Sequence, residues 1–484
     1  MHPRPGPLSL TLFVRFGFIH LLEGNVDHRM TSPFAAYQAP SHLLQVLQGI
    51  GYEEALPADD PRYVDTHEAR GSELTFKRLA QKFGWNPAND EFFAPKERHV
   101  LFFGHIGSGK TTELRHYAAK LNDSRRFYVV EVDVLLKLDR NNLQYAEVLL
   151  AMAESLFERL RDDHIQLGET ALEPIRSWFA SAIQSRSSSS ELSAELKTGI
   201  RAGGGIPGLI QLLASFTAAF KTGASQKMEW RQEIRNGFTS LASAFNTLIR
   251  TAEAALDRDG RGTRLLFLID GTDKMRSEDI QQFFVQDAEQ LLAIMSLVIY
   301  TAPLHLKYDG LLGGKLDADI VLPMIKLQEQ DGSPFPPGLM AMRELLLKRA
   351  DRSLFASDAE VERLVDFSGG HPRELLRLLK LCCEYADDRI DAAVVEKAIG
   401  KLAAEYRYFL QPDDYQLLKS IDTTAFHYGT DRREQELLHR LALLQYNDGS
   451  WRRSHPVVRT LDGYRHASGE AGRPQAGAAV LPSS

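Results

Sequence analysis

One glycine-rich stretch constrains what this chain can fold into more than any other feature. It reads Gly104-His105-Ile106-Gly107-Ser108-Gly109-Lys110-Thr111 and fits the pattern G-x-x-x-x-G-K-[ST]. The apolar residues 100–103 precede it and suit a buried strand, and an apolar stripe at helical spacing follows it: Leu114, Tyr117, Ala118 and Leu121. Because the pattern lies between an expected strand and an expected helix, we predict a phosphate-binding loop and not a simple glycine-rich turn.

Each residue of this loop has a predicted task. Gly104, Gly107 and Gly109 permit backbone angles that side chains forbid, so successive N–H groups can face the phosphates at a helix N-terminus. Lys110 is expected to reach the β- and γ-phosphates of ATP, and the Thr111 hydroxyl is expected to ligate Mg²⁺. The other expected nucleotide contacts come from His105, Ile106, Ser108 and Thr112.

The composition leaves room for such a site but adds little to it. With 484 residues, 44% of them hydrophobic, the chain can bury large cores, and we expect about two to four domains. The formal net charge of −7 argues against a wholly basic nucleic-acid binder, although local basic patches remain open. Cys382 and Cys383, the only cysteines, are neighbours in a leucine-rich stretch and supply neither a disulfide framework nor a zinc site, which suits a reducing cytoplasm.

Two apolar segments have to be distinguished from signal peptides and membrane spans. Residues 8–22 are largely apolar, but Arg15 interrupts them and no small-residue cleavage site follows. Residues 1–29 are either an upstream extension of the reading frame or a genuine arm, since Met30 begins a more ordinary sequence. Residues 203–220 carry no charge, but their glycines and Pro207 predict a poor helix. A partly buried segment or a subunit contact is favoured there over a membrane span.

A strand that ends in a carboxylate is expected to supply the second half of a nucleotide site. Residues 265–269 are apolar and lead directly into Asp270. Asp270 would hold Mg²⁺ through water and complete the clamp that Thr111 begins. Asp273 follows closely and is interpreted as a residue that orients or deprotonates the attacking water, with a helix cap as the alternative.

The remaining strand signals predict an α/β fold. Apolar runs at residues 127–134, 297–300 and 320–322 alternate with helical patterns, which is typical of a doubly wound parallel sheet. Ligands bind at the carboxyl ends of such strands, and Asp270 lies at one of these ends. A large insertion at about residues 137–262 separates the second strand from Asp270.

The insertion has its own organisation. Residues 149–160 carry one amphipathic helix, residues 185–190 form a polar connection, and residues 191–200 favour a strand or hairpin. An apolar stripe over residues 230–252 predicts one long helix that Gly260 ends. The stripe packs either on the insertion's own core, which is favoured, or against a partner or a second copy.

Several motifs together resemble the AAA+ and STAND branch of P-loop ATPases, especially bacterial single-chain ATPases built like origin-recognition initiators. The resemblance covers roughly residues 60–460. Besides the phosphate-binding loop it rests on four segments: Asp60-Pro61-Arg62-Tyr63-Val64-Asp65 with Arg70-Gly71, Asp270-Gly271-Thr272-Asp273, Gly369-Gly370-His371-Pro372-Arg373, and the stretch 437–456.

The resemblance implies where further nucleotide contacts lie. Tyr63, Val64 and Pro372 are expected beside the adenine, and Arg373 is expected to read the γ-phosphate. A winged helix is implied near the C-terminus, with a wing turn at Asn447-Asp448-Gly449, residues that tolerate positive φ. The implied parts are a segment that reaches the adenine side (residues 30–95), a P-loop core (96–330), a helical lid (335–405), a winged helix (406–465) and a disordered tail (466–484).

Two departures from the family limit what the resemblance implies. No arginine occurs between Ser277 and Met342, where AAA+ motors place an arginine that reaches a neighbouring subunit. The basic candidates there are Lys307, Lys315 and Lys326, which lack the planar fork of arginine. Thr301, where many motors have asparagine and many STAND proteins have arginine, is retained as a candidate catalytic residue. We therefore expect a slow, nucleotide-gated switch and not a fast motor.

Three functional classes follow. The leading one is a cytoplasmic, Mg²⁺-dependent ATPase switch that binds ATP or ADP, acts on a protein partner or separate effector, and is a candidate homo-oligomer. By resemblance, such ATPases serve in bacterial defence or conflict systems. The second is a DNA-associated loader whose winged helix touches phosphates through Arg452, Arg453 and Arg459. The third is a nucleotide-binding scaffold with negligible turnover. No membrane role is expected.

Overall fold

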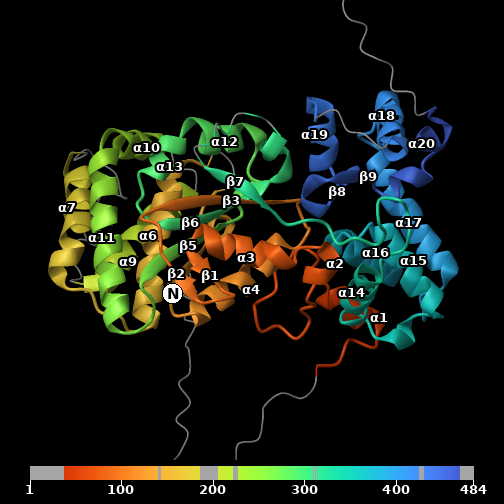
Figure 1. The fold of residues 1–484 in the computed structure, drawn as a ribbon, viewed down its shortest axis with the longest axis horizontal. Coiled ribbons are helices and arrows are strands. Elements are labelled where there is room, and N and C mark those ends of the chain that lie inside the picture. The colour runs from red at the N-terminus through yellow and green to blue at the C-terminus, as the bar shows by residue number, and fades with distance from the viewer. Residues whose placement is uncertain are drawn as a thin grey trace, which may run out of the picture. The chain divides into compact units, whose positions relative to one another are not determined.

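A five-stranded parallel sheet in the order β4-β5-β6-β3-β7 forms the centre of the fold (Figure 1). The computed structural model describes residues 37–139, 143–185, 205–221, 227–308, 316–424 and 430–468, together with Gly310, Leu312 and Gly314. The strands are β3 (Arg98–Gly104), β4 (Phe127–Asp133), β5 (Arg264–Asp270), β6 (Leu297–Pro303) and β7 (Asp317–Val321). The predicted parallel α/β sheet and each of its predicted strands are confirmed.

Helices cover both faces of this sheet because side chains alternate along each strand. On one face, Phe102 and Leu266 pack with α4 (Lys110–Asp123) and α3 (Glu73–Lys82). On the other face, Leu101 and Phe267 pack with helices of the insertion. All neighbouring strands run parallel, so their carboxyl ends meet at one edge, where the loop after β3 and Asp270 at the end of β5 lie.

The insertion between β4 and β5 is helical in the part that the structure describes. One expectation there was wrong: residues 205–221 form a regular helix although their glycines and Pro207 predict a poor one. The helix forms because its apolar side packs on α6, which outweighs the weak local propensity. The helices are α5 (Val134–Lys137), α6 (Tyr145–Asp162), α7 (Glu169–Ser185), α9 (Gly205–Lys221), α10 (Lys227–Asn236) and α11 (Phe238–Arg258).

The apolar stripe over residues 230–252 belongs to two helices and not to one. The chain breaks at Gly237, whose carbonyl accepts a hydrogen bond from the Trp178 indole at 3.2 Å. A side chain at Gly237 would meet the same indole ring at 3.2–3.3 Å, so the break lies in close contact with α7. The stripe is buried against other parts of this chain, as favoured, but in a core that the insertion shares with the sheet, since α11 packs on both α7 and β5. Gly260, at φ +64°, follows the end of α11. The predictions for residues 1–36, 186–204 and 469–484, and for Lys315, lie outside the described residues.

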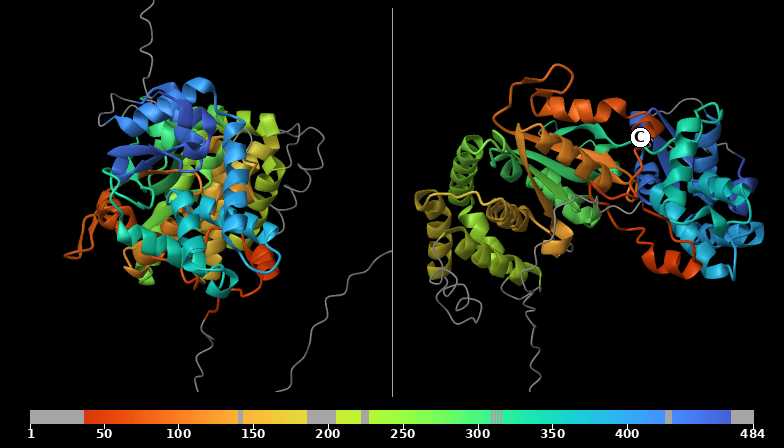
Figure 2. Two further views of the ribbon diagram at one scale, coloured as in Figure 1. Left: turned by 90° about the vertical axis from the view of Figure 1, so that its right-hand side faces the viewer. Right: turned by 90° about the horizontal axis from the view of Figure 1, so that it is seen from below.

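Two helical groups follow the sheet in sequence (Figure 2). The first, here called the lid segment, contains α14 (Pro336–Leu347), α15 (Asp358–Ser368), α16 (Pro372–Tyr385) and α17 (Ala392–Arg407). The second, here called the C-terminal module (residues 412–466), contains α18 (Pro412–Thr423), α19 (Arg432–His439), β8 (Leu443–Tyr446), β9 (Trp451–Ser454) and α20 (Asp462–His466). β8 and β9 form the expected antiparallel hairpin, with Asn447 and Gly449 at positive φ.

The remaining elements flank the sheet or precede it. None of the helices in the described part of the chain is both long and apolar enough to cross a bilayer. These elements are α1 (Leu43–Gly49), α2 (His67–Arg70), the short antiparallel pair β1 (Trp85–Asn86) and β2 (Glu91–Phe92), α12 (Ser277–Gln281) and α13 (Ala288–Leu292).

Candidate nucleotide site

The predicted phosphate-binding loop connects β3 to α4, as its sequence pattern requires. Gly107 and Gly109 adopt φ of +83° and +96°, which side chains rarely allow. Gly109 is the residue immediately before α4, so the loop ends at a helix N-terminus, where N–H groups without helical partners favour anions. The local backbone is therefore a cradle of the kind that binds phosphate.

Lys110 is held at the centre of this cradle by three acceptors. Its ammonium lies 2.7 Å from Asp273 Oδ2 and donates to the carbonyls of Gly104 and His105 at 3.1 and 2.9 Å. The pairing joins two residues that the sequence placed at one site from separate motifs. A phosphate group that binds here competes with these acceptors for the same ammonium.

Thr111 and Asp270, the two predicted metal-binding residues, are in direct contact. The Thr111 hydroxyl lies 2.9 and 3.0 Å from the two carboxylate oxygens of Asp270. Burial, reinforced by the nearby negative charge of Asp273, raises the pKa of Asp270 above its usual value. A divalent cation would relieve this cost, and a hydroxyl with a carboxylate is a donor set that Mg²⁺ accepts. The residues present therefore fit a bound Mg²⁺.

Asp273 has an environment that differs from that of Asp270. Burial tends to raise its pKa, but the Lys110 ammonium outweighs this and holds the pKa below its usual value. Its second carboxylate oxygen, Oδ1, is buried and has no hydrogen-bond partner among the described residues. A side-chain hydrogen bond from Thr301 also helps to lower the pKa of Asp273.

Thr301 lies between the two halves of the site without lining the cleft. It is fully buried near the carboxyl end of β6, and its hydroxyl accepts a hydrogen bond from Gly271 N at 3.0 Å. The Thr272 hydroxyl donates to the Thr301 carbonyl at 2.5 Å. The structure thus places Thr301 behind the turn that carries Asp273, where it holds that turn.

Two residues at the start of α16 bring the lid segment onto the phosphate-binding loop. The Arg373 guanidinium lies against Gly107, where an added Cβ would come within 2.7 Å of Arg373 Nε. Arg373 Nε is buried and has no acceptor among the described residues. His371 Nε2 lies 3.0 Å from the carbonyl of Ile106, and burial lowers the pKa of His371 well below its usual value, so the ring is neutral. The Arg373 guanidinium therefore covers the loop from the lid side, and its Nε has no acceptor among the described residues.

A cleft of about 850 Å³ free of protein atoms, solvent at its mouth included, extends from the loop toward the predicted adenine side. Its apolar lining there comes from Val64 together with Leu345, Pro372 and Leu376 of the lid segment. Tyr63 also lines it, with its ring stacked on His116 at 3.4 Å between centroids. The loop residues that line the cleft are Gly107, Gly109, Lys110, Thr111 and Thr112, whereas Gly104, His105, Ile106 and Ser108 are not among its lining residues.

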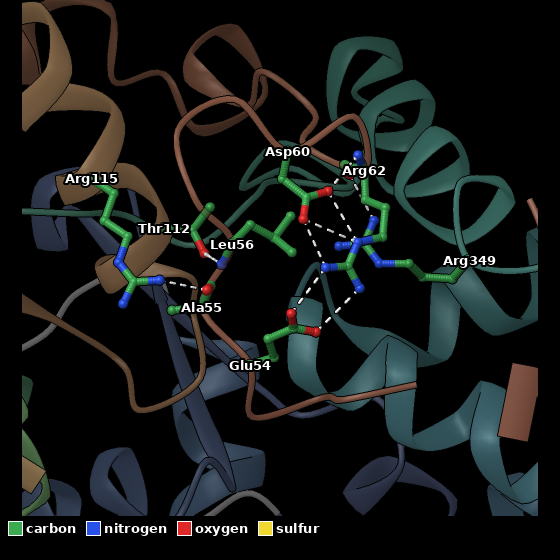
Figure 3. A network of polar contacts seen from close by, with 8 residues as sticks. All are labelled: Glu54, Ala55, Leu56, Asp60, Arg62, Thr112, Arg115 and Arg349. Carbon is green, nitrogen blue, oxygen red and sulfur yellow. Dashed lines mark hydrogen bonds and ion pairs between the residues drawn. The ribbon is translucent and has the colours of Figure 1, made fainter. Parts of the chain in front are cut away.

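Residues 52–63, here called the strap, follow one side of the cleft and are tied to α4 (Figure 3). Arg115 donates to the carbonyl of Ala55 at 2.6 Å, and the Leu56 N–H donates to Thr112 Oγ1 at 3.2 Å. Since Thr112 lines the cleft beside Thr111, the strap is bonded directly to the expected phosphate site.

Ion pairs also form within the strap, and hydrogen bonds connect it to the lid segment (Figure 3). Arg62 makes a two-pronged ion pair with Glu54 at 2.9 and 3.1 Å and a second pair with Asp60 at 2.7 Å. Arg349, just beyond α14, donates to the Arg62 carbonyl at 2.7 Å, and Lys348 donates to the Tyr63 carbonyl at 2.6 Å. The strap thus bridges a helix of the core and a helix of the lid segment.

Some of these supporting residues escape analysis of the sequence alone. Arg70 belongs to a motif that predicts no role for its side chain, but it is fully buried, lines the cleft and donates to the carbonyl of Ser108 at 2.7 Å, which fixes the loop. The ion-pairing of Glu54 with Arg62 has no sequence signature. His371 belongs to the motif that contains Pro372 and Arg373, and only its contact with Ile106 reveals that it reaches the loop.

The strand, loop and helix geometry together with the parallel sheet decide the fold. The chain has the P-loop α/β fold. This confirms, for the fold, the resemblance stated from the sequence. No protein-family model matches the sequence, and no curated protein matches it.

Several solved structures are similar to this chain, the following three among them. Cdc6p from Pyrobaculum aerophilum is 14% identical, with 81% of each chain covered and a TM-score of 0.34. The Orc1 protein of Aeropyrum pernix, solved in complex with DNA, is 13% identical, with 82% of this chain and 80% of that chain covered and a TM-score of 0.34. A Walker-type ATPase of Pyrococcus abyssi is 11% identical, with 86% of this chain and all (100%) of that chain covered and a TM-score of 0.37.

Proposed function

We propose that this chain is a Mg²⁺-dependent, ATP-binding and slowly hydrolysing switch of the AAA+/STAND type. The observation that carries the proposal is the meeting of Lys110, Thr111, Asp270 and Asp273 beside a glycine cradle that Arg373 covers. A cytoplasmic location and a role in a bacterial defence system, with a separate effector protein as partner, are the finer parts of the proposal and rest on the resemblance of the motifs.

The residues divide into those that hold ATP and those that act on it. Lys110 and the loop N–H groups bind the phosphates, while Thr111 and Asp270 hold Mg²⁺, which neutralises charge that develops on the phosphates. In hydrolysis, water attacks the γ-phosphorus as the bond to the bridging oxygen breaks, and Asp273 is the candidate acceptor for the proton of that water. Arg373 covers the loop from the lid segment and supplies a further cation.

The state of Asp273 supports slow turnover. A carboxylate whose pKa is held down by an ammonium is a weak base, and its ion pair with Lys110 has to loosen before it can serve water. In this arrangement the carboxylate becomes free only when a bound phosphate draws the ammonium away, and this additional step is consistent with slow hydrolysis. The same observation keeps open a nucleotide-binding scaffold with negligible turnover, and measured turnover separates the two.

A second candidate function is a DNA-associated ATPase that uses the C-terminal module as a winged helix. Arg452, one of the three arginines considered for phosphate contacts, is buried and pairs with Glu434 at 3.1 Å, so it is committed inside the protein. Arg453 and Arg459 are partly buried, and each has a buried nitrogen with no acceptor among the described residues. The candidate DNA-binding function therefore rests on these two side chains, and a salt-dependent affinity for DNA tests it.

The decisive experiment compares wild-type protein with Lys110→Ala. Removing the ammonium from a dry, preorganised cradle should lower ATP affinity or turnover at least about tenfold. Binding of a fluorescent ATP analogue with Mg²⁺ and release of phosphate give the two readouts. Lys120→Ala, on the exposed side of the same helix, is the matched control and should behave like the wild type. Unchanged affinity and turnover in a folded Lys110→Ala protein would refute the proposal.

A further inference from the structure

His105 is the first variable residue of the phosphate-binding loop, and its side chain points away from the cleft. It is almost completely buried and lies against the C-terminal module, more than three hundred residues later in the chain. Nδ1 lies 3.2 Å from the carbonyl of Leu438 in α19, and Nε2 lies 2.9 Å from the amide nitrogen of Gln445 in β8. Both ring nitrogens are therefore used by main-chain groups of one distant segment.

The two partners fix the chemical state of the ring. A main-chain N–H can only donate, so Nε2 accepts from Gln445 and carries no proton. A carbonyl can only accept, so Nδ1 carries the proton and donates to Leu438. A doubly protonated ring would face the Gln445 N–H with a second donor. Burial, and then the nearby Lys110 ammonium, lower the pKa of His105 to about 3, which is consistent with a neutral ring.

The main chain of His105 belongs to the phosphate site itself. Its carbonyl accepts from the Lys110 ammonium at 2.9 Å, and the carbonyl of the next residue, Ile106, accepts from His371 of the lid segment. One residue thus contacts the C-terminal module through its side chain and the phosphate-binding lysine through its main chain. A bound phosphate therefore changes the bonding of the His105 peptide, because it takes over the ammonium that this carbonyl now accepts from.

The receiving strand is firmly attached to the core at the same residue. The Gln445 carbonyl accepts from Met324 N at 3.4 Å, and its side-chain oxygen accepts from the Tyr308 hydroxyl at 2.6 Å. Arg452 of β9 also donates to that oxygen at 3.3 Å. Gln445 therefore uses its N–H, its carbonyl and its side chain at one junction between β8 and the core.

We propose that His105 is a positioning residue that couples occupation of the phosphate-binding loop to residues 438–446 of the C-terminal module. The proposal rests on the proposed nucleotide function, because it is a bound phosphate that displaces the Lys110 ammonium. Binding energy that orders the loop stabilises the Gln445 N–H bond to His105, and by reciprocity an intact bond strengthens nucleotide binding. The C-terminal module is in this way part of the nucleotide site although it does not line the cleft.

Hydrogen–deuterium exchange on the full chain tests the coupling. With Mg²⁺ and a non-hydrolysable ATP analogue, exchange of the Gln445 amide in β8 should slow at least about threefold in the wild-type protein. His105→Leu fills a similar volume without ring nitrogens, so it should abolish this protection and weaken nucleotide binding about three- to thirtyfold. His105→Gln, which restores an acceptor near the position of Nε2, should recover part of both effects.

The outcomes of this experiment distinguish a failure of the coupling from a failure of the proposed function. If the wild-type protein binds no nucleotide, the proposed function falls and the coupling falls with it. If it binds nucleotide and the Gln445 amide exchanges at an unchanged rate, the coupling alone is wrong, and this result needs no variant to fold. Wild-type affinity with full protection in His105→Leu would also overturn the role of His105. Lys110→Ala should show no ligand-dependent protection.

Discussion

The Lys110 ammonium lies 2.7 Å from the Asp273 carboxylate, with 3% and 4% of the two side chains exposed. An ion pair this deeply buried is costly to form, and breaking it by removal of one partner usually costs several kcal/mol, about 3–5. Because both residues also belong to the predicted nucleotide motifs, we expect each partner to have a second use. We expect Lys110 to bind phosphate, and we expect Asp273 to act once that ammonium has turned to the phosphate.

Asp273→Asn tests this division of tasks. The amide keeps the shape of the carboxylate but cannot accept a proton from water, so turnover should fall at least about a hundredfold. ATP affinity should stay within about threefold, since Lys110 keeps two carbonyl acceptors and its access to phosphate. Single-turnover hydrolysis and equilibrium binding measure the two quantities. Asp257→Asn, exposed near the end of α11, is the control, and equal losses of binding and turnover in Asp273→Asn would mark the residue as structural.

Gly107 is the second point at which the site is easily tested. At φ +83°, with Arg373 Nε 2.7 Å from the position of an added Cβ, Gly107→Ala adds backbone strain of roughly 1–3 kcal/mol and pushes the arginine away. We expect ATP affinity to fall at least about tenfold. Gly400→Ala, in α17 with nothing within 4 Å of the added carbon, should raise stability by about 0.5–1 kcal/mol and leave binding alone. Isothermal titration and thermal unfolding of both variants check this, and wild-type affinity in Gly107→Ala would contradict the cradle.

The strap is expected to control how fast nucleotide leaves. The Glu54 side chain is 45% exposed, so its pair with Arg62 should be worth little, whereas Asp60 is 11% exposed and should matter more. Arg62 also holds the pKa of Asp60 below its usual value, which shows that the charged form of Asp60 is stabilised by this pair. We expect Asp60→Asn to raise the dissociation rate of a fluorescent ADP about five- to tenfold and Glu54→Gln to raise it about twofold or less. Stopped-flow displacement measures both rates, and equal rates in all three proteins would show that the strap does not gate exchange.

The sequence predicts the sheet and the loop well because these depend on local patterns. The strand runs, the glycines at positive φ and the order of Lys110 and Thr111 are all contained in short windows. The approach of Asp270 to Thr111 follows from the rule that parallel strands present their carboxyl ends at one edge. Local pattern and simple topology thus account for the centre of the candidate site.

The parts that the sequence does not predict depend on contacts between distant residues. The Trp178 indole contacts the break at Gly237, and the helix at residues 205–221 packs on α6. The contacts of His105 with Gln445 join segments that no periodicity relates. Backbone hydrogen bonds from a side chain to a remote strand leave no compositional trace, so only the folded structure reveals them.

Arg373 is expected to couple the nucleotide to the arrangement of the lid segment. Its guanidinium already lies on Gly107, and Nε has no acceptor among the described residues, so a γ-phosphate offers it a contact that ADP lacks. A ligand shifts a conformational equilibrium only by its differential affinity for the two states, and one charge-assisted hydrogen bond of roughly 1.5–3 kcal/mol supplies a ten- to hundredfold bias.

Arg373→Ala should therefore leave ADP affinity within about threefold while it abolishes any ATP-dependent compaction or assembly. Small-angle scattering on the wild type and the variant, each with ADP and with a non-hydrolysable ATP analogue, measures this directly. Arg407→Ala removes an exposed arginine from the end of α17 in the same lid segment and should respond to ATP like the wild type. An identical ATP-dependent change in Arg373→Ala and the wild type would refute the coupling role, because the variant has no guanidinium with which to distinguish ATP from ADP.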